Sequence, residues 1–242
     1  MLIFSGDWHG EYDKAYRKMK ELDLRDCTIV QVGDFGVGFE RPKKDLRLLQ
    51  RLNDMLAHRN VLLYAFRGNH DDPKYFDGTI NMSNLKLLPD YSVIEAYGKK
   101  ILCIGGAVSV DRKPNPEEKN AYGKPWKGRK VNYNYWENET FILDQTKLDV
   151  SDIDIVATHS APNFCFPLLK GNVEKWFRHD IGLKELCQEE RDNHTKVYEI
   201  LKGKRNNLTH WFYGHFHMEK SEMIDDTKFV LLDINQFYEV RF

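Results

Sequence analysis

Residues 2–10 read LIFSGDWHG, a short apolar run that ends at once in glycine, an acid and a histidine. The apolar run, Leu2–Ser5, predicts a strand. Asp7 and His9 stand two positions apart, so an extended backbone places both side chains on the same side, where they can face one site. The flanking glycines allow a sharp turn and a close approach of the backbone. The sequence therefore predicts a polar loop with metal-binding side chains directly after the first strand.

Outward from this loop, the chain alternates between helical and strand-like patterns. Residues 14–24 have apolar side chains at helical spacing, and residues 28–32 form a second strand-like run. A second amphipathic helix begins near Pro42, and residues 61–66 form a third strand-like run. This strand–helix–strand–helix–strand order predicts right-handed βαβ units and a mainly parallel sheet.

Further along the chain, residues 100–104 and 153–158 predict strands, and residues 174–191 and 195–201 predict helices. The end of the chain has three strand-like runs with short connections. These runs predict antiparallel strands, with Asn235-Gln236 as a tight turn. The three runs are residues 210–213, 229–234 and 237–242.

The stretch 111–136 has no clear period and mixes proline and glycine with aromatic and basic residues. A long irregular insertion in a compact domain is usually functional or mobile. Basic residues among aromatics can hold phosphate and stack a base. The alternative is a surface excursion whose aromatic side chains pack into the core. We expect a single domain over residues 1–242 that carries this insertion.

The whole composition is that of an ordinary globular protein, with 41% hydrophobic and 30% charged residues and a net charge of -1. This charge does not favour a nucleic-acid or membrane surface. No stretch approaches the roughly 18–20 apolar residues of a membrane span, and the first residues do not form a signal peptide. The four cysteines lie far apart and form no C-x-x-C pair. These features favour a reducing compartment, and we expect a cytoplasmic location.

Five short segments combine metal-ligand residues, most of them with glycine, and each follows a predicted strand: residues 6–10, 33–36, 68–71, 158–160 and 214–217. In open α/β sheets, sites form beyond the carboxyl ends of the strands. Carboxylates, imidazoles and an amide oxygen suit Mn, Fe or Zn, and the lack of cysteine argues against a structural thiolate zinc site. One carboxylate can bridge two ions, which would clamp a phosphoryl group and activate a water. The candidate ligands are Asp7, His9, Asp34, Asn69, His159, His215 and His217.

Together these segments resemble the calcineurin-like metallophosphoesterase superfamily, whose pattern is D-x-H, G-D, G-N-H-[D/E], H and G-H-x-H. All five blocks are present in order between Asp7 and His217, so the resemblance covers most of the chain. It implies an α/β fold, a four-layer α-β-β-α sandwich with two mixed sheets. It also implies a binuclear metal-dependent phosphoesterase, in which a metal-bridging hydroxide attacks a phosphomonoester or phosphodiester.

The resemblance also implies roles for single residues. His70 would be the catalytic residue that stabilises the transition state or protonates the leaving oxygen, which suits an imidazole near neutral pH. The cofactors would be two divalent metal ions, with Mn expected first and Fe, Zn or Ni as alternatives. The ligands carry over by position, with one ion on Asp7, His9 and His217, the other on Asn69, His159 and His215, and Asp34 bridging them.

Two blocks resemble the phosphoprotein-phosphatase branch of this superfamily in particular, namely Gly6-Asp7-x-His9-Gly10 and Arg67-Gly68-Asn69-His70. In Arg67-Gly68-Asn69-His70, the arginine is a candidate for substrate binding through a bidentate contact with phosphate. A structural ion pair is the alternative for Arg67.

Residues 161–171, which follow His159, are expected to form one wall of the cleft, and Trp8 and Phe35 another.

The second block departs from that branch, which continues as G-D-x-V-D-R-G. Val37 and Gly38 stand here where the acid and the arginine would be. The missing acid orients the catalytic histidine, and the missing arginine grips phosphate. As hypotheses, Asp71 or Asp72 replaces the acid, and Arg112 or another residue of the insertion replaces the arginine. The departure weakens the case for protein phosphatase activity.

The expected substrate is a phosphorylated molecule of unknown class, and nucleotides, nucleic-acid ends, phosphoproteins and small metabolites all stay open. One alternative is a nuclease that acts on single-stranded nucleic acid, although duplex binding normally uses a basic face. A second alternative is a non-catalytic scaffold with a decayed metal site. The presence of every ligand position and of His70 argues against that scaffold.

Overall fold

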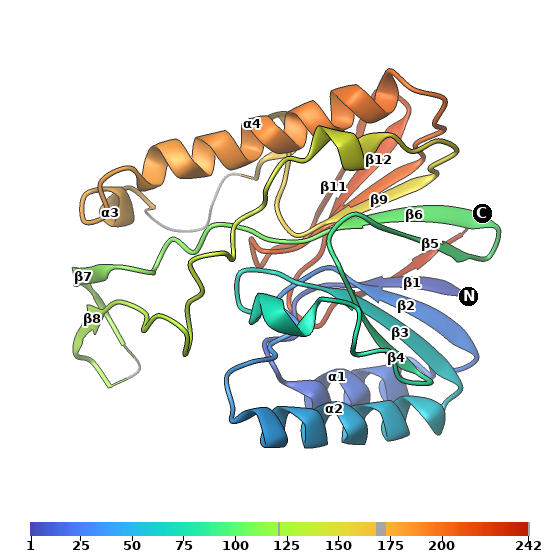
Figure 1. Ribbon diagram of the computed structural model, residues 1–242, viewed down its shortest axis with the longest axis horizontal. Helices are drawn as coiled ribbons and strands as arrows, with labels where there is room; N and C mark the ends of the chain where they lie inside the picture. Colours follow the sequence, from blue (N-terminus) through green and yellow to red (C-terminus); the bar gives the residue numbers. More distant parts are fainter. Residues whose placement is uncertain (121, 168–172, 242) are drawn as a thin grey trace.

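Two β-sheets lie face to face, and helices cover both outer faces (Figure 1). The computed structural model describes residues 1–120, 122–167 and 173–241. Helices α1 (Tyr12–Glu21) and α2 (Pro42–Ala57) cover one sheet, and α4 (Leu183–Lys202) covers the other. The expected four-layer α-β-β-α sandwich with two mixed sheets is therefore confirmed.

The first sheet has the strand order β13-β1-β2-β3-β4. Strands β1 to β4 run parallel, as the alternation of strands and helices predicted, and β13 pairs with β1 in the antiparallel direction. The sheet is therefore mixed. Its strands are β1 (Leu2–Ser5), β2 (Cys27–Gln31), β3 (Val61–Phe66), β4 (Leu85–Leu88) and β13 (Phe237–Val240).

The second sheet has the order β11-β12-β10-β9-β6-β5. Its four middle strands run parallel to one another, and the two outer strands are antiparallel to their neighbours. The strands are β5 (Ser92–Ala96), β6 (Lys99–Ile104), β9 (Ile155–Thr158), β10 (His210–Tyr213), β11 (Lys220–Ile224) and β12 (Thr227–Leu231). Short 3-10 helices lie at Pro73–Tyr75, Gln145–Leu148 and Asn163–Cys165.

Strand β1 shows how the sequence builds these layers. Leu2 and Phe4 belong to the apolar cluster between the two sheets, whereas Ile3 packs under α1 and α2. The ring of Phe4 stacks on Phe212 of the second sheet, with centroids 3.8 Å apart. A strand buried on both faces needs a continuous apolar run, which explains why residues 2–4 show no alternation.

The predicted arrangement of the last strands is wrong. Strands β10 and β12 are parallel neighbours, and β12 and β13 lie in different sheets. The polar strand β11 is not recognised from the sequence because it is an edge strand with no buried residue. Its hairpin with β12 reverses the direction of the chain, so that β12 runs parallel to β10. A turn that includes Asn235 follows β12, as expected, but it carries the chain from one sheet to the other.

The helices near residue 190 also differ from the prediction. The single helix α4 continues through residues 191–195, where the prediction had a break between two helices. The short helix α3 (Glu174–Phe177) precedes it. Gly182 separates the two helices with a φ of 85°, a conformation that glycine adopts without steric cost. The break therefore comes at a glycine inside the predicted segment.

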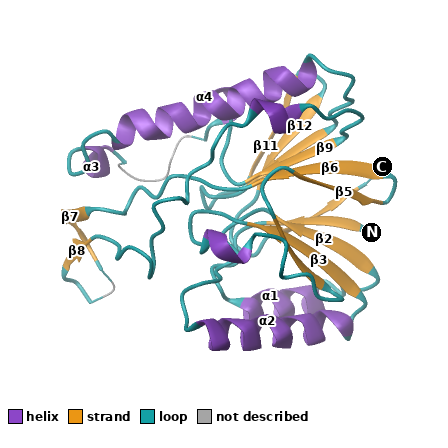
Figure 2. Cartoon of the chain, in the orientation of Figure 1, coloured by secondary structure: helices purple, strands orange, loops and turns teal. Residues whose placement is uncertain are grey.

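The insertion contains a small hairpin of β7 (Pro114–Lys119) and β8 (Pro125–Lys127), which lies beside α3 (Figure 2). We call β7, β8 and α3 the cap. Three contacts tie its parts together: Glu117 binds Arg178 at 2.6 Å, Glu118 pairs with Lys175, and Asn115 donates to the Lys175 carbonyl. The insertion is thus a defined element fastened to the segment before α4.

The broader predictions have different outcomes. All four cysteines are described, and each is a free thiol. Within the described ranges, no helix combines the length and apolarity needed to cross a membrane. The division of the chain into one domain and the cytoplasmic location stay predictions.

Candidate metal centre

The five polar segments meet at one end of the sandwich, next to the cap (Figure 1). Three of them follow β1, β2 and β3 of the first sheet, and two follow β9 and β10 of the second. Because these strands are parallel within each sheet, their carboxyl ends reach the same edge. Segments far apart in the sequence therefore contribute to one site.

The first cluster consists of Asp7, His9, Asp34 and His217, with one ligand atom of each within 4.8 Å of the others. Nε2 of His9 lies 3.0 Å from Nε2 of His217, which in turn lies 3.3 Å from Oδ2 of Asp7. Imidazole nitrogens and carboxylate oxygens that face one another in this way form a donor set for a divalent metal.

The second cluster consists of Asp34, His159 and His215, again with ligand atoms within 4.8 Å. Nε2 of His159 lies 3.1 Å from Oδ1 of Asp34 and 3.1 Å from Oδ1 of Asn69. Nδ1 of the same ring donates to the Val32 carbonyl at 2.8 Å. This hydrogen bond orients the ring and directs Nε2 into the cluster, as the outer partners of metal-binding histidines do.

Asp34 belongs to both clusters and is almost fully buried. Burial opposes its ionisation, but the combined effects of the neighbouring histidines, chiefly His159, outweigh burial and hold the pKa of Asp34 well below its usual range. Burial alone would likewise lower the pKa of His159, whereas the Asp34 carboxylate raises it to about 10. Asp34 and a protonated His159 therefore attract each other. A bound metal ion would take the place of the His159 proton, because a metal-binding imidazole is neutral.

Four ligand residues have a positive φ, a conformation that costs a residue other than glycine about 1–3 kcal/mol. Such residues cluster at sites where side chains must be aimed in one direction. Gly33 also has a positive φ of 92°, and a Cβ there would run into the imidazole of His159. The four ligand residues are His9, Asp34, His215 and His217, with φ of 48°, 52°, 69° and 48°.

These residues fit divalent metals in composition as well as in geometry. The donors are carboxylates, imidazoles and the Asn69 amide, and none is a thiolate. Such a set suits first-row divalent ions. Each cluster can hold one ion, and the shared Asp34 lies between them.

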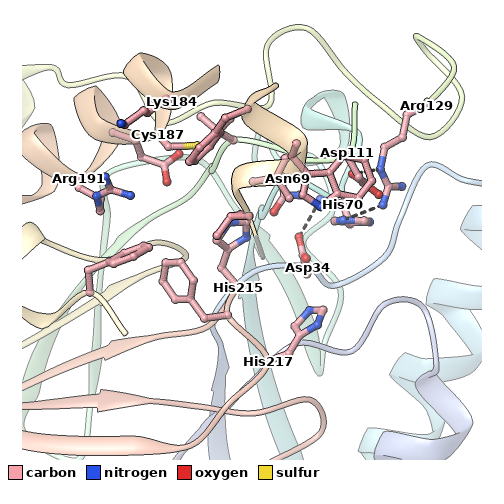
Figure 3. Close-up of a pocket in the computed structure, with 18 of the residues that line it drawn as sticks. Asp34, Asn69, His70, Asp111, Arg129, Lys184, Cys187, Arg191, His215 and His217 are labelled. Atoms are coloured by element: carbon pink, nitrogen blue, oxygen red, sulfur yellow. Dashed lines mark hydrogen bonds and ion pairs between the residues drawn. The ribbon is translucent and has the colours of Figure 1, made fainter. Parts of the chain in front are cut away.

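His70 lies at the edge of both clusters, against an arginine of the insertion (Figure 3). Its backbone N–H donates to Oδ1 of Asp34 at 2.7 Å, and Nη2 of Arg129 lies 3.3 Å from its Nε2. Nε of Arg129 donates to Asp111 at 2.6 Å, which orients the guanidinium. Burial lowers the pKa of His70 to about 4. Arg129 is therefore the insertion arginine that lies beside His70, whereas Arg112 pairs with Asp180.

The hypothesis that Asp71 or Asp72 orients His70 is wrong. The Asp71 carboxylate accepts four backbone N–H groups at 2.7–3.1 Å, from residues 35–37 and from Gly68. A carboxylate has about four acceptor positions, so none is left for the His70 ring. Asp72 accepts from the Lys74 N–H and pairs with its ammonium group. Asp71 instead joins the loop after β2 to the loop after β3.

The two other candidate arginines have structural partners. Arg67 is buried, and its guanidinium binds Asp90 at 2.7 Å and the carbonyls of residues 138–140. This is the ion pair considered as the alternative, so the substrate contact expected for Arg67 is not supported. Arg112 pairs with the buried Asp180 at 2.6 Å.

The expected walls of the cleft are partly confirmed. Phe166 lines the cavity beside the clusters. Residues 168–171 of the expected wall lie outside the described residues. Trp8 and Phe35 are fully buried in the core between the first sheet and its helices, so the wall expected from them is wrong.

Two supporting residues had gone unrecognised in the sequence. Nδ2 of Asn69 donates to Oγ of Ser109 at 2.9 Å, which leaves the amide oxygen facing His159. The Ser109 N–H donates to the buried Glu139 carboxylate at 2.7 Å. Neither Ser109 nor Glu139 stands in a motif, because each acts only through a neighbour from a distant part of the chain.

Comparison with protein families gives a match to the calcineurin-like phosphoesterase model over residues 2–219. The chain belongs to the calcineurin-like phosphoesterase family. The resemblance of the five motif blocks to this family is thereby confirmed, and this phosphoesterase carries the candidate metal ligands of both clusters. A search among curated proteins found no match.

Solved structures similar to this phosphoesterase include phosphopantetheinyl hydrolase from Mycobacterium tuberculosis, with 14% identity and a TM-score of 0.42, covering 97% of this chain and 90% of that one. Another is GAP50, the anchor in the inner membrane complex of Plasmodium, with 13% identity and a TM-score of 0.42, covering 97% and 72%. At these values, neither structure informs us about the substrate.

Proposed function

We propose that this phosphoesterase hydrolyses a phosphomonoester or phosphodiester with two divalent ions, one in each cluster. The observation that carries this proposal is the Asp34 carboxylate, which lies between two ligand sets that border one cavity. When bound, the ions would polarise the phosphoryl group and lower the pKa of the attacking water. The proposed ligands are Asp7, His9, Asp34, Asn69, His159, His215 and His217.

His70 and Arg129 line the same cavity and are the proposed partners of the phosphoryl group. The planar guanidinium of Arg129 can bind two phosphate oxygens at once. Its ion pair with Asp111 holds it in that direction. With its pKa lowered by burial to about 4, the His70 ring is neutral near pH 7, and its remaining N–H can donate a hydrogen bond to the transition state, one of the two roles expected from the family pattern.

Metal removal tests the proposal directly. We expect a chelator to abolish hydrolysis of p-nitrophenyl phosphate and bis-p-nitrophenyl phosphate, and Mn to restore it, with Fe, Zn and Ni as the next ions to try. Steady-state rates and elemental analysis measure the effect, and the preferred ester separates monoesterase from diesterase. His70→Ala is expected to lower the restored rate about 100-fold or more. Full turnover by protein shown to lack metal would contradict the proposal.

Arg129→Ala is expected to lower kcat/KM by about 10–100-fold, because a charge-assisted hydrogen bond to phosphate is lost. Arg129→Lys should recover only part of this loss, since lysine lacks the planar fork. The exposed neighbour Lys130 provides the control, and Lys130→Ala is expected to keep the parent kcat/KM. Equal rates for the Arg129 and Lys130 variants would remove Arg129 from the site.

The two alternatives receive less support. The basic residues of the insertion 111–136 that made single-stranded nucleic acid conceivable include Arg112 and Arg129, and both already pair with carboxylates. A decayed scaffold would not need four strained ligand residues aimed at one point. We therefore retain phosphoester hydrolysis as the proposed function.

A further inference from the structure

The metal centre opens on a cavity of about 550 Å³ that reaches helix α4 (Figure 3). Asp34 and His217 line the metal side of this cavity, and Lys184 and Arg191 of α4 line the opposite side. A phosphoryl group bound at the clusters would occupy only the metal side, which leaves the space toward α4 for the leaving group of the substrate.

Aromatic side chains from three segments line this space: Phe166, Trp176, Phe177 and Phe216. Phe166 and Phe216 meet edge to face, with centroids 5.2 Å apart. Trp176 and Phe177 come from α3, so the cap supplies part of the wall. Rings arranged in this way offer flat apolar surfaces on which another flat group can stack.

Lys184 and Arg191 add positive charge on the far side of this wall. They stand seven residues apart, about two helical turns, and so share one face of α4. The Arg191 guanidinium lies 4.3 Å from the Phe166 ring centroid and hydrogen-bonds to the neutral side chains of Asn163 and Gln188. Within the part of the chain that the structure describes, neither cation forms an ion pair or a hydrogen bond with an acidic side chain, although the charge of Arg191 acts on the buried Glu190.

The other charges that line the cavity are already balanced or weakened. Arg129 pairs with Asp111, and Lys175 pairs with Glu118. Burial raises the pKa of Glu190 to about 7, so this carboxyl group opposes an anion only in part at neutral pH. The spare positive charge of the cavity therefore belongs to Lys184 and Arg191.

We infer that the leaving group of the substrate has a flat apolar body and carries a second anionic group, which Lys184 and Arg191 bind. This inference rests on the proposed hydrolysis at the metal clusters and names the class of ester that it acts on. Nucleotides with two phosphates are molecules of this class. The rings of the cavity stack on the apolar body, and the cations on α4 select esters that carry the second charge.

A matched pair of esters tests this inference: biphenyl phosphate with a carboxylate at its far end, and the same ester with a carboxamide there. The two differ little in shape and in the acidity of the leaving phenol. With Mn-loaded protein, we expect kcat/KM to be about 10-fold higher for the carboxylate, the effect of one charge-assisted contact. In the double variant K184Q/R191Q, this ratio should fall to about 1. The control K196Q, exposed on the same helix, should keep the ratio of the parent protein.

A binding measurement separates this inference from the proposed function. The hydroxybiphenyl carboxylate, which is the product, is titrated calorimetrically into metal-free protein beside its carboxamide. Tighter binding of the carboxylate that disappears in K184Q/R191Q supports the inference even without turnover. Should the double variant not fold, the single variant K184E, at an exposed position, should invert the preference. Equal binding and equal kcat/KM for the two compounds would overturn the inference, while turnover of both esters would leave the proposed function standing.

Discussion

Asp34→Asn is expected to lower kcat/KM for p-nitrophenyl phosphate more than about 100-fold. Mutation of a residue that only orients a metal ligand typically lowers metal affinity or activity about 10–100-fold. Asp34 is itself a candidate ligand in both clusters, so a larger loss is expected. Asparagine keeps the size but removes the charge and one acceptor oxygen. Steady-state kinetics measure the rate, and elemental analysis should show less bound metal per chain.

Asp45 provides the matched control for this substitution. It is another buried aspartate, bound to the Tyr75 hydroxyl at 2.9 Å, and it belongs to neither ligand cluster. Asp45→Asn should therefore keep most of the activity and the metal content. If both variants lost activity equally, the effect would report general damage to the fold, and the assignment of Asp34 as the shared ligand would fail.

Asp71→Ala is expected to lower the free energy of unfolding by about 3–5 kcal/mol, because it strips the acceptor from four backbone N–H groups. Three of these groups belong to the loop that carries Asp34, and the fourth belongs to Gly68, beside Asn69. Activity should fall as well, since two ligand-bearing loops lose their connection. Urea unfolding of metal-free protein measures the change in stability without a contribution from bound ions.

The neighbouring Asp72 shows what an ordinary capping carboxylate contributes. It caps the short helix Pro73–Tyr75 through the Lys74 N–H and pairs with the Lys74 side chain at the surface. Asp72→Ala should therefore cost only about 1 kcal/mol. A loss for Asp71→Ala no larger than this would show that the four hydrogen bonds do not hold the loops together.

Much of the fold followed from local patterns. The buried strands β1, β2 and β3 are apolar runs between amphipathic helices, and this order leads to a parallel sheet. The edge strand β11 and the cap hairpin escaped prediction because their residues are mostly polar and few of them are buried. The direction of β12 escaped for the same reason, since it depends on the hairpin with β11.

The sequence by itself determined the family and the candidate metal ligands, because strand, glycine and candidate ligand recur in one order. Only the tertiary structure decided which residues support that site. The sequence offered Asp71 to orient His70, Arg67 to bind phosphate and Arg112 or another insertion residue as the second arginine. In the structure, Asp71 joins two loops, Arg67 pairs with Asp90, and Arg129 of the insertion lies against His70. The physical reason is that a ligand motif consists of residues close together in the sequence, at the end of a single strand. A hydrogen-bond partner, in contrast, comes from a distant part of the chain and is known only once the chain has folded.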